Sequence, residues 1–167
     1  PRWCVALRST RPTGSAQIAS AARMRAWYAD SVERFLAREA EDVVGRLSAA
    51  QGLTHAGEAA RQIAAWQSVV AQLRTALAAM PRGWTLALEY DLLRLEKRLD
   101  AVLLTDRAIL VIEFKDGTQH TPDALAQVED YALDLHDFHA ASRRYPVVPV
   151  LVTRDAPDRP IDWPLLW

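Results

Sequence analysis

The sequence has a single cysteine, no long apolar run and no strong net charge. Cys4 cannot form an internal disulfide or a thiolate zinc site, which favours a reducing compartment, so we expect a cytoplasmic protein. No apolar run approaches the roughly 20 residues that cross a bilayer, so we expect no membrane partner. The formal net charge of −1 excludes a uniformly basic coat for nucleic acid, so a phosphate contact needs a local patch or a metal.

Two further absences concern the organisation of the chain. The sequence starts with Pro1 rather than methionine, and it has no Gly-x-x-x-x-Gly-Lys-Ser/Thr loop that would cradle a nucleotide phosphate. The start without methionine predicts a processed piece of a longer protein. Within the chain we expect a flexible lead-in over 1–20, a single domain over 21–155 and a tail or linker to a missing downstream domain over 156–167.

The periodicity of the apolar residues predicts helices first and strands later, in a helical part over 21–83 and a sheet core with the active site over 84–155. The later strands contain apolar residues without alternation, which indicates a sheet covered on both faces. The fold class that follows is α/β, a mixed central sheet flanked by helices, with an N-terminal helical segment. The expected helices lie near Val32 and Val43, over 56–79 and after Thr121-Pro122, and the expected strands lie over 85–90, 99–104, 108–115 and 147–152.

The scarcity of lysine draws attention to Lys115. The chain has two lysines against eighteen arginines, and Lys115 ends the apolar run Val111-Ile112-Glu113-Phe114-Lys115. Thr105 to Ala108 reads as a tight turn whose register sets Asp100 opposite Glu113. Because strand side chains alternate between faces, Glu113 and Lys115 point the same way, and Asp100 joins them.

Two carboxylates this close repel each other unless a cation lies between them. Oxygen ligands suit Mg²⁺ or Mn²⁺, so Asp100 and Glu113 are candidate metal ligands, with the backbone carbonyl of Phe114 and Glu89 as further candidates. A metal held in this way lowers the pKa of a bound water, while Lys115 orients that water or stabilises developing negative charge, as phosphodiester hydrolysis requires. The alternative is a structural ion pair at a strand end. For Glu89 the alternative is a solvent-facing strand residue.

Gln127 and Tyr131 lie four residues apart on the helix that follows, and hence on one helix face. By themselves they fit an ordinary amphipathic helix equally well. After the Glu-x-Lys strand, they are candidate supporting residues of the same site.

Asp100, then Glu113-Phe114-Lys115, then Gln127-Val128-Glu129-Asp130-Tyr131, in this order, resemble the PD-(D/E)XK nuclease superfamily and its RecB-like branch with a Gln-x-x-x-Tyr motif. Over about Ala26 to Asp155 the chain is similar to the N-terminal nuclease-like domain of bacterial proteins that continue into a superfamily-one-type DNA/RNA helicase. The resemblance implies a restriction-endonuclease-like fold. Its implied catalytic residues are Asp100, Glu113 and Lys115, supported by Gln127 and Tyr131. One departure is Leu99, which stands where the superfamily has proline.

The leading hypothesis is therefore an Mg²⁺-dependent deoxyribonuclease domain of a larger helicase–nuclease protein. One alternative is a non-catalytic nucleic-acid-binding or scaffolding domain of a helicase protein. The other keeps the chemistry and changes the substrate to RNA.

Overall fold

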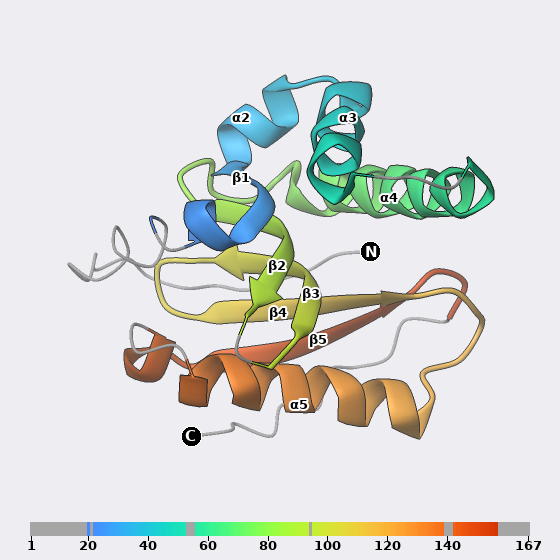
Figure 1. The fold of residues 1–167 in the computed structure, drawn as a ribbon. Coiled ribbons are helices and arrows are strands. Elements are labelled where there is room, and N and C mark those ends of the chain that lie inside the picture. Colours follow the sequence, from blue (N-terminus) through green and yellow to red (C-terminus); the bar gives the residue numbers. More distant parts are fainter. Residues whose placement is uncertain (1–19, 21, 53–55, 94, 139–141, 157–167) are drawn as a thin grey trace.

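The computed structural model describes residue 20 and residues 22–52, 56–93, 95–138 and 142–156 (Figure 1). The expected lead-in and tail lie almost wholly outside the described residues. The elements are, in order, β1 (Ala26–Ser31), α2 (Val32–Ala37), α3 (Ala40–Gln51), α4 (Ala56–Leu77), β2 (Thr85–Leu92), β3 (Lys97–Leu104), β4 (Ile109–Lys115), α5 (Pro122–Phe138), the 3₁₀ turn η1 (Ser142–Arg144) and β5 (Val147–Thr153).

The five strands form one sheet in the order β1-β2-β3-β4-β5. Neighbouring strands are antiparallel except β4 and β5, which run parallel because α5 crosses over between them. The sheet lies between α2, α3 and α4 on one face and α5 on the other (Figure 1). This confirms the expected mixed α/β arrangement. Within the described residues, no helix combines the length and the apolar character that a membrane span requires.

Each face of the sheet carries its own apolar core. Leu86, Leu88 and Leu103 pack with Phe35 and Trp66 on the side of α2 to α4. On the other side, sheet residues pack against the buried stripe of α5, and the stripe consists of Ala124, Val128, Ala132 and Leu135. Each fully buried Leu or Val contributes roughly 1.5–3 kcal/mol. Leu125 lies outside this stripe, because the residue is 40 % exposed.

The hairpin of β3 and β4 has the register that the turn predicts. Ala101 pairs with Ile112, and Leu104 pairs with Ile109. The turn is closed by Thr105, whose N–H donates to the Ala108 carbonyl at 3.0 Å and whose Oγ1 accepts the Ala108 N–H at 3.0 Å. Continuing this register by one position sets Asp100 level with Glu113.

The first strand is the element that the sequence reasoning missed. Ser31 caps α2, since its Oγ accepts the Arg34 N–H at 3.2 Å. However, Ala26–Ser31, directly before this cap, forms β1 and pairs with β2. This six-residue edge strand is stabilised by pairing with a segment more than fifty residues away. Local periodicity carries no information about such a distant partner.

The neighbouring strands β2 and β3 lose their regular alternation at one level of the sheet. Leu88 packs on the α4 side and Tyr90 on the α5 side, although residues two apart in a regular strand share a face. Leu99 and Ala101 of β3 show the same change of side. The register is unchanged, because Leu88 still pairs with Ala101 and Tyr90 with Leu99, so no residue is inserted.

Glu89 lies at the centre of this irregular level. Its φ of 51° is in the left-handed region, which costs a non-glycine residue about 1–3 kcal/mol. The described ladders skip Trp27, Glu89 and Asp100, and the register sets these three residues in one row that Glu113 continues. The row thus contains three carboxylates on three adjacent strands.

Candidate active site

Glu113 is the most buried member of the candidate site. Its residue is 4 % exposed, and its Oε1 accepts two hydrogen bonds, from Lys115 Nζ at 2.9 Å and from Gln127 Nε2 at 3.2 Å. Its other oxygen, Oε2, is buried and has no hydrogen-bond partner among the described residues. Buried carboxylate oxygens are normally bonded, so this oxygen is open to a water, a cation or the protonated Asp100 carboxyl.

Gln127 and Tyr131 meet on α5 as their spacing predicts. The helix begins with Thr121 as its cap, since Thr121 Oγ1 accepts the Ala124 N–H at 3.3 Å. The Nε2 of Gln127 donates to Tyr131 Oη at 2.7 Å and also to Glu113. Gln127 therefore ties α5 to the Glu-x-Lys strand and fixes which oxygen of Glu113 is left free.

Asp100 lies beside this network at the irregular level of β3. Its Oδ2 accepts the backbone N–H of Phe114 at 2.9 Å, which brings its carboxyl to β4 beyond the last ladder pair. Burial and the charge of Glu113 raise the pKa of Asp100 to about 6, and the Phe114 N–H and Lys115 lower it only in part. The folded structure thus holds the Asp100 carboxyl close enough to Glu113 for the charge of Glu113 to oppose the ionisation of Asp100.

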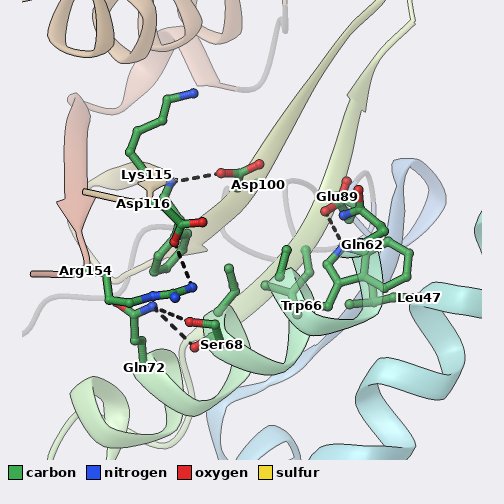
Figure 2. A pocket seen from close by; sticks show the side chains of 14 residues that line it. Leu47, Gln62, Trp66, Ser68, Gln72, Glu89, Asp100, Lys115, Asp116 and Arg154 are labelled. Carbon is green, nitrogen blue, oxygen red and sulfur yellow. Dashed lines mark hydrogen bonds and ion pairs between the residues drawn. The ribbon is translucent and has the colours of Figure 1, made fainter. Parts of the chain in front are cut away.

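Lys115 is held as a cation. Burial lowers the pKa of its ammonium, but the hydrogen bond to Glu113 and the charges of Glu113 and Asp100 outweigh this, so the net pKa is raised. The side chain is 37 % exposed and extends away from α4 (Figure 2). Lys115 can therefore donate hydrogen bonds to a substrate or a water, and it is not suited to remove a proton.

Glu89 is buried, at 7 % exposure, and both of its carboxylate oxygens are bonded to other side chains. Its Oε1 accepts the indole N–H of Trp66 at 2.7 Å, and its Oε2 pairs with Arg98 Nε at 2.5 Å. Burial and the charge of Asp100 raise its pKa, while Trp66 and Arg98 lower it. The interpretation of Glu89 as a metal ligand is not supported, and neither is that of a solvent-facing residue.

A pocket of about 160 Å³ lies between α4 and the sheet (Figure 2). Asp100 and Glu89 line its sheet wall, and Ser68 and Gln72 line its helix wall. The lining also includes Arg154, which pairs with Asp116 at 2.8 Å. Asp100 thus borders this pocket and also lies beside Glu113.

The donor set fits a hard divalent cation. Mg²⁺ commonly uses one or two carboxylates and keeps several waters. Asp100 and Glu113 supply the carboxylates, and the unpartnered Oε2 of Glu113 is an available oxygen. Among the described residues, no group of three or more His, Cys, Asp or Glu side chains is arranged to hold a metal. A metal here would therefore be held by the two carboxylates, the Phe114 carbonyl and water.

The sequence reasoning missed two residues around this site. Trp66 lies in the core, and its indole N–H also donates to Glu89. Arg98 pairs with Glu89 and lies over the ring of Trp27, with its guanidinium carbon 4.2 Å from the ring centroid. Neither residue has a motif spacing that could have signalled these contacts.

Comparison of the chain with protein-family models, with curated proteins and with solved structures finds no match.

Proposed function

We propose that the chain is a metal-dependent nuclease domain that hydrolyses phosphodiester bonds of DNA, with a restriction-endonuclease-like fold. The observation that carries the proposal is the state of Glu113. One carboxylate oxygen is bound by Lys115 and Gln127, while the other is buried without a partner beside the Asp100 carboxyl. A structural ion pair would leave this second oxygen desolvated at a cost of about 1–3 kcal/mol or more, and a ligand site explains it.

Asp100, Glu113 and the Phe114 carbonyl would hold Mg²⁺ or Mn²⁺. Such an ion supplies a more acidic water and neutralises charge on a phosphate. The charge balance supports this assignment, because two carboxylates against the single Lys115 leave about one negative charge in a half-buried site.

The other side chains of the site would have separate roles in hydrolysis. In hydrolysis a water oxygen bonds to phosphorus, the ester P–O bond breaks, and the leaving oxygen takes up a proton. The Lys115 ammonium orients the water or donates to the phosphate oxygens, on which negative charge grows. Gln127 holds Glu113, and Tyr131 holds Gln127, so these two residues orient the site.

We further propose that the domain acts beside a helicase module of the same full-length protein. The support for this partner is the resemblance of the motifs at Asp100, Glu113 to Lys115 and Gln127 to Tyr131 to bacterial helicase-linked nucleases. DNA is preferred to RNA as the substrate on the same ground.

The test is a cleavage assay with end-labelled single- and double-stranded DNA and RNA, in Mg²⁺, Mn²⁺ or chelator. The variant is Lys115→Ala. The matched control is Arg107→Ala, which removes an exposed cation from the turn at the other end of the same hairpin. We expect metal-dependent cleavage of DNA that Lys115→Ala loses and Arg107→Ala keeps.

Two results would contradict the proposal. Cleavage that continues in chelator or survives in Lys115→Ala would show that another site or a contaminant is responsible. A folded wild type that cleaves no substrate, alone or within the full-length protein, would favour the scaffolding function. Cleavage of RNA alone would leave the chemistry in place and change the substrate to RNA.

A further inference from the structure

The pattern of apolar residues does not explain why the strands change side at the irregular level of the sheet. Leu88 and Tyr90 lie on opposite faces, as do Leu99 and Ala101, and the residues between them are Glu89 and Asp100. If both strands alternated regularly, the Asp100 side chain would leave β3 in another direction relative to β4. The change of side accompanies the hydrogen bond from the Phe114 N–H to Asp100 Oδ2.

A connected cluster of side chains surrounds the left-handed residue. Glu89, Arg98, Trp66 and Trp27 form this group, hereafter the Glu89 cluster. Both oxygens of the Glu89 carboxylate are used, one by Trp66 and one by Arg98. The two indole rings meet edge to face at 6.2 Å between centroids, and Trp27 Nε1 donates to Asp91 at 3.2 Å. The cluster thus joins α4, β1, β2 and β3 around one backbone position.

We propose that the Glu89 cluster consists of positioning residues that hold Asp100 beside Glu113. A residue kept in the left-handed region persists only where its surroundings determine it, and here the two bonds to the Glu89 carboxylate do so. The register sets Glu89 directly beside Asp100 in the row. The left-handed backbone at Glu89 therefore alters the position of Asp100 on the neighbouring strand. In this position the Asp100 carboxyl accepts the Phe114 N–H.

The consequence for metal binding rests on the proposed function, whereas the positioning of Asp100 does not. Residues that orient a metal ligand typically change the affinity for the metal about 10- to 100-fold when they are lost. Arg98 is suited to this role because its planar guanidinium pairs with a carboxylate on one edge and stacks on an indole with its face.

The test measures amide hydrogen exchange by NMR on the full chain in chelator. The Phe114 amide reports on the bond to Asp100, and the Ile109 amide, which donates to the Pro146 carbonyl at 2.9 Å, is a reference at the other end of β4. The variants are Arg98→Gln and Trp66→Phe, which keeps an aromatic ring in the core and removes the donor to Glu89. The control is Arg34→Gln, which breaks an exposed pair with Asp30.

We expect exchange at Phe114 to accelerate at least about tenfold relative to Ile109 in both variants and to stay unchanged in Arg34→Gln. Calorimetry with Mn²⁺ should show binding weakened about tenfold or more. A Phe114-to-Ile109 ratio equal to that of the wild type in a folded variant would overturn the proposal, because the cluster would then contribute stability alone. A wild type that binds no Mn²⁺ would contradict the proposed function, and the exchange ratio would still decide this inference.

Discussion

Replacing Asp100 by asparagine is expected to stabilise the metal-free protein at neutral pH. The Asp100 carboxyl has a pKa of about 6 in the folded protein against 3.8 as its ordinary value, and burial and the neighbouring Glu113 are the main causes. The folded protein therefore holds this proton more tightly than the unfolded chain does. The contribution of Asp100 to the free energy of unfolding is fully present below pH 3.8, and it is lost as the pH rises through 6.

The magnitude follows from the two pKa values. A carboxyl with a pKa of about 6 in the folded state and 3.8 in the unfolded chain costs the folded state about 3 kcal/mol once it is ionised. Asparagine avoids this cost. Its side-chain oxygen can still accept the Phe114 N–H, and its amide can donate to the free Oε2 of Glu113. We expect a gain of about 2–3 kcal/mol above pH 7.

The assay is urea unfolding in chelator between pH 4 and pH 8. With a typical denaturant dependence of about 2 kcal/mol per molar urea, the midpoint of Asp100→Asn should exceed that of the wild type by about 1 M at pH 8. The difference should shrink towards pH 4. Glu129→Gln, which removes an exposed carboxylate from α5, is the control and should show no such trend. A difference that is constant with pH, or a variant less stable than the wild type at pH 8, would refute the reasoning.

Three further predictions concern the metal and the chemistry. Mn²⁺ binding measured by calorimetry should weaken about tenfold per pH unit below pH 6, because a protonated Asp100 is a poor ligand, and a flat profile would contradict the assignment. Lys115→Ala should reduce the cleavage rate at least about 100-fold. Mn²⁺ binding should be retained, because the ammonium no longer competes with the metal for Glu113. Loss of Mn²⁺ binding would show instead that the lysine has a structural role. Tyr131→Phe should cost about 1 kcal/mol in urea unfolding, because Gln127 loses an acceptor; an unchanged stability would show that this bond contributes nothing.

The sequence predicted the parts of the site that depend on local rules. A four-residue turn at Thr105 fixed the register of the hairpin, and this register carried Asp100 to the level of Glu113. Helical spacing placed Gln127 and Tyr131 on one face of α5, and the parallel crossover brought that face to the Glu-x-Lys strand. Strand alternation and helix periodicity are properties of adjacent residues, so they can be read from the chain.

The parts that failed depend on contacts between distant segments. Glu89 was expected on a regular strand, but its carboxylate accepts a hydrogen bond from Trp66 of α4 and pairs with Arg98 of β3. Its backbone lies in the left-handed region, and no local sequence pattern predicts this conformation. The strand Ala26–Ser31 was missed for a related reason, because its hydrogen-bond partners lie in β2.

Calorimetric titration of the chelator-treated chain with Mn²⁺ at pH 7.5, for the wild type and for Glu113→Gln, tests the central claim most directly. Glutamine keeps the size of the side chain and an acceptor for Lys115, but it deletes the charge that holds a cation. The account predicts one binding event in the wild type and at least about a hundredfold weaker binding in the variant. A wild type that binds no Mn²⁺, or a variant that binds it equally well, would contradict the claim that the Asp100–Glu113 pair is a metal site.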